Sequence, residues 1–348
     1  LTLGVLLDRY FREAATFLDN VPDSQRTART HGKMLLAYFT PACDVCDLCQ
    51  DDVVAYTRWR MVGSFVYDVD PITRKERKAR PVRAKAAEAD LIVLYRALKW
   101  ATTVRVGKGR RLLDRHPLQG VRRIREQNPK RPIATWERYQ KTRKAAQDLA
   151  ANAEVARLAA TKDTERAAAE AERDKWVRVE LFVVLLEATG RRSNSVRQLH
   201  WEDMNLARAE ITWRAETDKK RRASVVPIPA ALVDELRTFQ RQLGAVGGYV
   251  FPAQLNPSEP ARRDVLPRQL LAAETHAGLS KLDGGLCHPY RRKWATERKD
   301  QSIKDVAAAG GWNDLRTVTT CYQKEDRTTM LAVMSEPKKL TEAAVLGA

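Results

Sequence analysis

The first hundred residues repeat apolar positions at a helical spacing. Leu91, Leu94, Tyr95 and Leu98 recur three or four positions apart, so they share one face of a helix. The same periodicity predicts helices over residues 3–18, 25–39, 51–62 and 84–100. Helices that each carry one apolar stripe gain most of their stability when the stripes pack together, which predicts a small N-terminal bundle.

A basic, proline-punctuated segment, DPITRKERKARPVRAK (70–85), separates the third and fourth predicted helices. Its prolines and charges predict a solvated loop. Such a loop could contact phosphate, and plain solvation explains the composition equally well.

Further along, an Ala/Glu/Arg-rich segment (134–190) predicts two long helices that break near residues 161–164 and stop at Gly190. Its middle has few large apolar residues, so we expect it to project into solvent. The period then changes, because AEITWRA (209–215) and ASVVPIP (223–229) alternate like strands around a charged turn. Helices return after Pro229 and from His288.

These patterns predict a mostly helical α+β protein, with an N-terminal helical bundle and a C-terminal mixed α/β domain that holds a small antiparallel sheet. A chain of 348 residues with 44% hydrophobic residues is long enough for two cores.

The chain is strongly basic, with 62 Lys and Arg against 44 Asp and Glu and a net charge of +18. This charge favours a polyanionic partner, either nucleic acid or an anionic membrane surface. The longest uncharged apolar run, 181–186, is too short to span a bilayer, and residues 1–20 lack a signal-peptide pattern. We therefore expect a soluble cytoplasmic protein. Because the chain starts at Leu1, we also expect a few N-terminal residues to be missing.

Nearly half of the excess charge lies in residues 105–131, which carry ten Lys or Arg and two acids. A stretch this cationic, broken by Gly and Pro, is typical of a linker that runs along a nucleic-acid duplex. The basic residues that we expect to contact DNA are Arg105, Lys108, Arg110, Arg111, Arg122, Arg123, Lys130 and Arg131.

Cys43, Cys46 and Cys49 have the tight spacing of metal ligands. No fourth ligand is evident nearby. We interpret them as reduced thiols in a loop and helix start, and we predict no metal.

The segment HPYRRKWATERK (288–299) places candidate anion ligands at a helix start. Pro289 suits the first helical position, which puts His288 at the N-cap and Arg291 one turn further on. Both would flank the positive end of the helix dipole, where an anion is favoured. Tyr290 and Trp294 would anchor the opposite face. Alone, this pattern is weak and favours an ordinary surface N-cap.

Three other segments are ambiguous in the same way. Arg191 and Arg192 lie in a turn between two predicted helices, and Lys219 and Lys220 lie in the turn of the predicted hairpin. Tyr322 follows Leu315 and Val318 at helical spacing, as a core tyrosine would.

Taken together and in order, four segments resemble the tyrosine recombinase (phage integrase) family. They are ATGRRSNSVRQLHWEDM, TDKKRRASVVPIP, HPYRRKWAT and GGWNDLRTVTTCY, and the likeness covers roughly residues 180–326. The resemblance implies that Arg192 and Arg291 bind the scissile phosphate, Lys219 is the general acid, and His288 and Trp312 assist. It implies that Tyr322 is the nucleophile, with Arg191 and Lys220 as possible substitutes for their neighbours.

The chain departs from the family pattern at several points. Ser195 replaces an acid that often follows the first arginine, and Arg292 stands where many members have His. One extra residue lies between Trp312 and Tyr322, which we expect the turn at 313–314 to absorb. The Ala-rich segment is also longer than usual. None of these departures removes a catalytic group.

The resemblance divides the chain into a helical, SAM-like core-binding domain (1–104) that binds DNA, a basic linker (105–131) and a catalytic domain with its tail (132–348). Tails of this family dock on a neighbouring protomer. We expect the tail apolar residues to do so, with packing against their own domain as the alternative. These residues are Met330, Leu331, Val333 and Met334.

The implied function is site-specific integration or excision of a phage or mobile element through a covalent 3′-phosphotyrosyl intermediate. We expect double-stranded DNA as the partner, a homo-tetramer on paired sites and a monomer or weak dimer when free. No cofactor and no membrane partner are expected, and the site of action would be the bacterial nucleoid. A topoisomerase IB-like nicking and resealing enzyme is an alternative that needs no tetramer. A catalytically silent DNA-binding relative is a second alternative.

Overall fold

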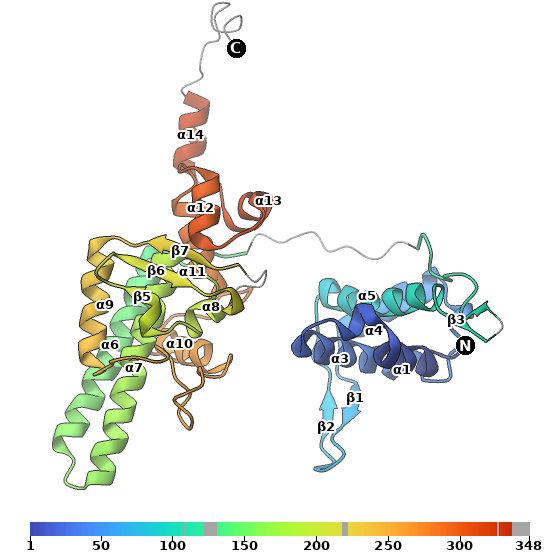
Figure 1. Ribbon diagram of the computed structural model, residues 1–348, viewed down its shortest axis with the longest axis horizontal. Coiled ribbons are helices and arrows are strands. Elements are labelled where there is room, and N and C mark those ends of the chain that lie inside the picture. Colours follow the sequence, from blue (N-terminus) through green and yellow to red (C-terminus); the bar gives the residue numbers. More distant parts are fainter. Residues whose placement is uncertain (108, 122–130, 218–221, 326, 336–348) are drawn as a thin grey trace, which may run out of the picture. The chain divides into compact units, whose positions relative to one another are not determined.

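The computed structural model describes residues 1–107, 109–121, 131–217, 222–325 and 327–335 (Figure 1). The chain divides into two compact units, Leu1–Pro129 (unit 1) and Lys130–Ala348 (unit 2). Within the described residues, no helix is both long enough and apolar enough to cross a bilayer.

Unit 1 is the expected helical bundle. The apolar stripe of the last helix, with Leu91, Leu94 and Leu98, is buried against Leu35 and Tyr56 of the preceding helices. The helices are α1 (Leu3–Glu13), α2 (Ala15–Leu18), α3 (Pro22–Phe39), α4 (Gln50–Val62) and α5 (Ala84–Ala101).

The loop expected between α4 and α5 is instead a β-hairpin. Strands β1 (Val66–Val69) and β2 (Glu76–Lys78) pair antiparallel, with a bulge in the register. Within the segment predicted as a loop (70–85), β2 is the part that contradicts the prediction. Its three residues, ERK, are all charged, so no apolar pattern marks the strand.

The segment expected as a linker also differs from the prediction. Its first part forms a second small hairpin, β3 (Arg105–Val106) with β4 (Arg110–Arg111). Leu113 and Leu118 are then buried in the bundle core, so residues up to this point belong to unit 1. Burial of these two leucines fixes the segment to the bundle although most of its neighbouring residues are charged. The composition of the segment does not reveal this burial.

Cys43 lies in the loop after α3, Cys46 in the 3₁₀ turn η1 (Val45–Asp47), and Cys49 at the N-cap of α4; the last two are exposed. Among the described residues, no group of three or more His, Cys, Asp or Glu side chains is arranged to hold a metal ion.

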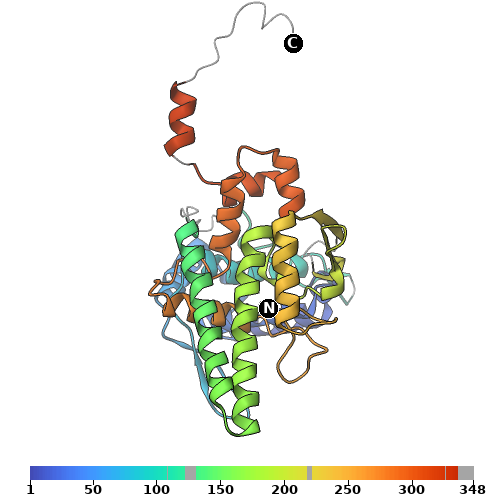
Figure 2. The same ribbon diagram turned by 90° about the vertical axis from the view of Figure 1, so that its left-hand side faces the viewer.

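Unit 2 is built on the long antiparallel helices α6 (Trp136–Ala159) and α7 (Asp163–Thr189). The expected break and the stop at Gly190 are confirmed, and Gly190 adopts the left-handed conformation with φ of 59°. The half of the pair nearest its connecting loop projects from the unit (Figure 2), where Val155 and Leu158 are exposed.

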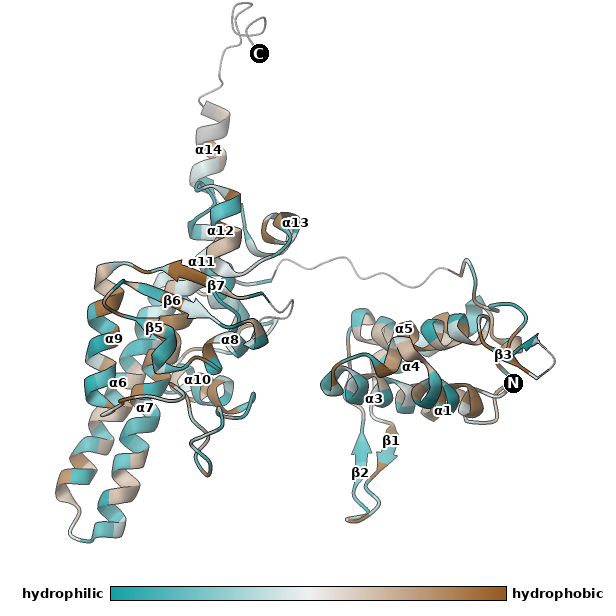
Figure 3. Ribbon diagram, in the orientation of Figure 1, coloured by the Kyte–Doolittle hydropathy of each residue, from teal (hydrophilic) through white to brown (hydrophobic). Residues whose placement is uncertain are grey.

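The other half of α7 forms the centre of the unit 2 core. A small antiparallel sheet packs near it, and β6 directs Ile211 and Trp213 inward. Helix α9 packs Leu236 and Phe239 into the core, and much of the helix is coloured hydrophilic in Figure 3. The sheet contains β5 (Met204–Asn205), β6 (Glu210–Trp213) and β7 (Ser224–Pro227) in that order, and the helices beside it are α9 (Ala230–Gln242) and α10 (Val265–His276).

Short elements complete unit 2 and carry most of the candidate residues. They are α8 (Ser193–Arg197), the 3₁₀ turns η2 (Trp201–Asp203) and η3 (Ala215–Thr217), α11 (His288–Glu297), α12 (Ile303–Gly310), α13 (Leu315–Thr317), the π-helical turn η4 (Val318–Tyr322) and α14 (Arg327–Ser335). Trp294, Trp312 and Val318 form a second, smaller core under them. Met330, Leu331 and Met334 on α14 are exposed, so these side chains do not fold back onto unit 2.

Candidate active site

Arg291 is the centre of the candidate site and one of the most deeply buried side chains of the protein. Its Nη1 donates to the carbonyl oxygens of Gly190 and Gly310, the latter at 2.7 Å. Its Nε and Nη2 are also buried but have no acceptor among the described residues. Burial is the main cause that lowers the pKa of Arg291 to about 9, so the group is still charged at neutral pH. Two buried cationic donors without an acceptor indicate an anion-binding site.

The N-terminal end of α11 supplies Arg291 and His288. Cys287, rather than His288, is the N-cap, so the helix starts one residue earlier than the sequence suggested. Tyr290 and Trp294 are buried, as expected. Tyr290 donates from its hydroxyl to Glu274 on α10 at 2.8 Å, and Glu274 also binds Arg138 on α6. This buried network holds α11 against the core.

Arg192 joins the site from the turn between α7 and α8, where it is half-buried. Its Nη1 donates to the carbonyl oxygen of Gly311 at 3.1 Å. Arg191 is more deeply buried, and its Nη2 donates to Ser224 and to the Ala308 carbonyl. Arg191 thus ties β7 to α12, which leaves Arg192 as the better candidate for phosphate.

The turn after α12 must stay small for these contacts to form. Gly311 has a φ of 70°, and a Cβ there would lie 2.5 Å from Nη1 of Arg191. A Cβ on Gly310 would lie 1.9 Å from the Trp312 ring. The two glycines therefore permit the guanidiniums and the indole to pack closely.

Trp312 and Tyr322 place their aromatic rings beside the Arg291 guanidinium. The guanidinium carbon of Arg291 lies 3.5 Å from the centroid of the Trp312 ring and 5.3 Å from that of Tyr322. The Trp312 and Tyr322 rings meet edge to face at 4.9 Å. The buried Nε1 of Trp312 has no acceptor in the described part of the chain, which adds a third donor to the same region.

His288 lies beside Tyr322, with ring centroids 6.4 Å apart. Loss of hydration is the largest cause that lowers its pKa to about 4, followed by repulsion from Arg292, Arg291, Arg192 and Arg131. The side chain itself is exposed at the rim of the site. Repulsion by the nearby guanidiniums also acts on a ring at the rim, because these cations are fixed in place. The imidazole is therefore neutral at pH 7 and can accept a proton.

The extra residue before Tyr322 is absorbed in η4. Gln323 N bonds to the carbonyl oxygen of Val318, five residues earlier, at 2.9 Å. A π turn accommodates one more residue than an α-helical turn, and such turns are frequent at functional sites. Asp314, in the turn where we expected this residue to be absorbed, caps α13 with its carboxylate.

The other departures from the family pattern have structural roles. Ser195 donates from its hydroxyl to the carbonyl oxygen of Thr217 at 3.0 Å, next to the hairpin turn. It does not orient Arg192, a role that the Gly311 carbonyl fills. Arg292 is buried and donates from Nη1 to the Pro132 carbonyl at 3.0 Å, which fastens the start of unit 2 to α11.

Several predicted residues cannot be placed near this cluster. Lys219 and Lys220 lie outside the described residues, as do Lys108, Arg122, Arg123 and Lys130. Of the other linker cations, Arg105, Arg110 and Arg111 are exposed on the β3–β4 hairpin of unit 1. Arg131 is exposed in unit 2 and packs its side chain against Gly284.

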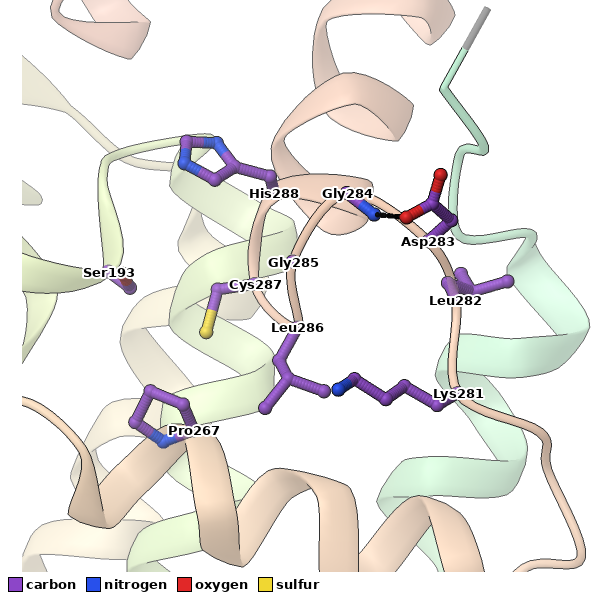
Figure 4. Close-up of a pocket in the computed structure, with 10 residues that line it drawn as sticks. All are labelled: Ser193, Pro267, Lys281, Leu282, Asp283, Gly284, Gly285, Leu286, Cys287 and His288. Carbon is purple, nitrogen blue, oxygen red and sulfur yellow. Dashed lines mark hydrogen bonds between the residues drawn. The ribbon is translucent and has the colours of Figure 1, made fainter. Parts of the chain in front are cut away.

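A pocket of about 700 Å³ opens beside the N-terminal end of α11. Its wall includes His288, Cys287 and the loop 281–286, with Ser193 and Pro267 across from the loop (Figure 4). The Gly284 amide donates to Asp283 at 2.7 Å and holds the loop in a tight turn. Burial raises the pKa of the Cys287 thiol to about 12, so this thiol stays protonated at neutral pH.

Sequence reasoning missed the main-chain part of the site. The carbonyls of Gly190, Gly310 and Gly311 orient both candidate phosphate-binding arginines. The Thr-Gly and Gly-Gly pairs were visible only as helix stops, and nothing in the sequence indicated that their carbonyls would meet one guanidinium cluster.

Comparison with known proteins identifies a family model that matches this chain and solved structures that share its fold. The model of the phage integrase family matches residues 151–328, which is about half of the chain. No curated protein matches the sequence.

Solved structures share the fold at low identity. The lambda integrase dimer bound to a COC′ core site has a TM-score of 0.64 at 17% identity, over 98% of this chain and 81% of that one. XerH bound to palindromic difH, a post-cleavage complex, scores 0.63 at 14%, over 96% and 94%. Tn1549 transposon integrase with transposon right end DNA scores 0.62 at 11%, over 96% and 98%. The chain therefore belongs to the phage integrase family, the tyrosine-type site-specific recombinases.

Proposed function

We propose that this recombinase cleaves and rejoins duplex DNA through a covalent 3′-phosphotyrosyl intermediate on Tyr322. The observation that carries the proposal is the pair of buried donors on Arg291 that have no acceptor in the described chain, beside the rings of Trp312 and Tyr322. A phosphodiester offers two non-bridging oxygens that match such a fork.

The chemistry follows from the placement of these groups. The Tyr322 phenolic oxygen attacks phosphorus, the bond from phosphorus to the 5′ oxygen breaks, and the 3′ phosphate becomes linked to tyrosine. Arg192 and Arg291 stabilise charge on the non-bridging oxygens of the pentacoordinate state, helped by the indole N–H of Trp312. The reverse attack by a 5′ hydroxyl rejoins the strand.

Two protons must move during cleavage. Neutral His288 is next to Tyr322 and accepts the phenolic proton. The leaving 5′ oxygen takes a proton from Lys219, a role that the family resemblance assigns and that Ser195 supports by holding the adjacent turn at Thr217.

We further propose that unit 1 is the core-binding domain and that duplex DNA is held by both units. The net charge of +18 and the exposed Arg105, Arg110, Arg111 and Arg131 support this assignment. Lambda integrase has been solved as a tetramer on a Holliday junction. On this ground we propose that paired sites assemble a tetramer of this chain.

The test is covalent trapping on DNA without Mg²⁺. Duplexes are first enriched from a random pool by binding to the wild type, then nicked near the centre so that a cleaved strand end diffuses away. We expect a denaturation-resistant adduct with the wild type and none with Tyr322→Phe. Tyr290→Phe serves as the matched control, because its phenol is buried against Glu274.

Absence of an adduct on DNA that the wild type binds tightly would contradict the proposal and favour a silent DNA-binding relative. An adduct that forms, with resealing but never strand exchange between two duplexes, would favour a topoisomerase-like enzyme. An adduct that persists in Tyr322→Phe would place the nucleophile elsewhere.

A further inference from the structure

The β1–β2 hairpin of unit 1 is a feature that the proposed chemistry does not use. It extends away from the helices of unit 1 (Figure 1) and spans the segment between α4 and α5. A bundle of this size needs only a short connection there, so the hairpin is an addition to the bundle rather than a requirement of its fold.

The base of the hairpin is fixed to the bundle. The Phe65 ring stacks on Trp59 of α4 with centroids 3.6 Å apart, and Ser64 N bonds to the Ala79 carbonyl at 2.7 Å. Gly63 turns the chain with φ of 69°, where a Cβ would lie 2.5 Å from the Arg80 main chain. Lys33 of α3 pairs with Asp68 of β1 at 2.8 Å. The hairpin is therefore held in one direction.

The tip is also pre-formed. The Asp70 carboxylate accepts from the amides of Ile72 and Thr73 at 3.0 and 2.8 Å, and Asp70 N bonds to the Lys75 carbonyl at 3.0 Å. Arg74 takes the left-handed conformation, with φ of 56°, to complete the turn. A tip that is already ordered loses little conformational entropy when it binds a partner.

The side chains that the tip displays are one apolar residue and two cations. Ile72 is 89% exposed. In the part of the chain that the structure describes, no acid pairs with Arg74 or Lys75, which are also exposed. A single exposed Ile is common, but this fixed turn presents it beside two cations that pair with no acid among the described residues. That combination suits a DNA groove, where phosphates line the edges and base edges, including thymine methyl groups, lie inside.

A cationic groove continues from the hairpin onto α3. It has a volume of about 380 Å³ and is lined on one side by Arg26, Arg29 and Lys33 and on the other by Arg77, with Asp68 as its acid. Arg26, Lys33 and Arg77 each pair with an acid, so the net charge of the groove is less positive than its number of cations suggests. It nevertheless gives a phosphate backbone a positive path beside the hairpin.

We propose that the hairpin is a DNA-reading element whose tip enters a groove of the duplex, with Ile72 against base edges and Arg74 and Lys75 on the flanking phosphates. A two-stranded ribbon fits the major groove, which is about 12 Å wide, and an aliphatic side chain there can contact thymine methyl groups. This inference rests on the proposed DNA function and adds to it a determinant of site preference outside the catalytic unit.

The test compares three purified full-length proteins with the wild type, first by sequencing duplexes enriched from a random pool and then by binding one enriched duplex across a range of salt. Ile72→Ser is expected to lose preference at one step of about two to four base pairs, with the rest of the motif kept and the affinity about tenfold lower. Arg74→Ser/Lys75→Ser is expected to weaken binding to all sequences and to reduce the salt slope by about 2.

The matched control is Lys162→Ser/Arg166→Ser, which removes two exposed cations at the start of α7 in unit 2. Its motif should equal that of the wild type and its salt slope should change by less than that of the tip variant. An unchanged motif with Ile72→Ser, or a tip double variant that matches this control in salt slope, would overturn the inference. Covalent trapping by the wild type is scored separately, so a failure of the hairpin inference leaves the cleavage result standing. A wild type that binds no DNA would defeat both.

Discussion

Arg291 lies over the Trp312 ring, with the guanidinium carbon 3.5 Å from the ring centroid, while its Nη1 donates to two glycine carbonyls. Stacking and main-chain bonds together fix the plane of the guanidinium. The remaining donors, Nε and Nη2, therefore keep one direction before any DNA arrives. Preorganisation of this kind is what gives electrostatic stabilisation its strength.

Replacing Arg291 should remove transition-state stabilisation more than binding. We expect Arg291→Ala to lower the rate of single-turnover cleavage by about 10² to 10³-fold, because two charge-assisted donors are lost. Arg291→Lys should fare little better, since an ammonium lacks the planar fork. Quenched-flow cleavage on a nicked duplex gives the rate, and equilibrium binding to the same duplex should change only a few-fold. Equal losses in rate and affinity would argue for a purely binding role.

The pKa of His288 should depend on whether a phosphate occupies the site. In the free protein it is lowered to about 4, with repulsion from four guanidiniums among the causes. A bound phosphodiester offsets that positive charge, so we expect the pKa to rise toward its ordinary value. Titration of the histidine ring signals by NMR, with His288→Asn for assignment and Tyr322→Phe to prevent cleavage, checks both values. An ordinary pKa in the free protein would contradict the prediction.

The same shift has a consequence for stability. Because the folded pKa is lowered from 6.5, the unfolded chain binds more protons between about pH 4 and 6.5. The contribution of His288 to stability is therefore complete above this window and declines as pH falls through it. His288→Asn should weaken the loss of stability between these two pH values, as measured by urea unfolding at a series of pH values.

The π turn before Tyr322 predicts an unusual tolerance to deletion. Thr320 is exposed within η4, so its removal should convert the π turn into an α turn while the flanking residues stay in place. We expect this deletion to keep cleavage within about tenfold of the wild type, as a π turn holds a single added residue. Deletion of Asn313 serves as the comparison and should abolish adduct formation, because it moves Trp312 relative to α13. Equal activity of the two deletions would show that the turn does not set the position of Tyr322.

The buried carboxylate of Glu274 should be required for the stability of unit 2. It binds Arg138 through two bonds of 2.9 and 2.7 Å and accepts from Tyr290. Glu274→Ala leaves the buried guanidinium unpaired, which costs about 3 to 5 kcal/mol of unfolding free energy. Asp234→Ala, which breaks an exposed pair with Arg237, should cost less than about 1 kcal/mol. Urea unfolding distinguishes these values, and similar losses in both variants would contradict the prediction.

Ser195 should act through the hairpin turn. Ser195→Ala removes the hydrogen bond to the Thr217 carbonyl. We expect cleavage to slow about tenfold, which corresponds to the net free energy of roughly one hydrogen bond. If that loss reflects a misplaced general acid, a substrate with sulfur at the 5′ bridging position should restore the rate, since a thiolate leaves without protonation. Lys219→Ala should be restored in the same way and Arg291→Ala should not. A Ser195→Ala defect that persists with sulfur would assign this serine to another step.

The sequence by itself determined the helical bundle, the long α6–α7 pair, the two main strands and the candidate chemical groups. These follow from periodicity, glycine stops and the order of short motifs, all of which are local in the chain. The short strand β1 and the fully charged strand β2 were not predicted, because pairing and anchoring, rather than an apolar pattern, stabilise them.

Only the tertiary structure decided which arginine faces the site and what holds it. Arg191 and Arg192 are adjacent and chemically identical, and the choice depends on acceptors from a turn more than 100 residues away. The sequence likewise does not reveal that Arg291 has two buried donors without an acceptor among the described residues, or that Tyr322 ends a π turn. Burial and main-chain carbonyl direction are properties of the packed fold, so no local pattern could specify them.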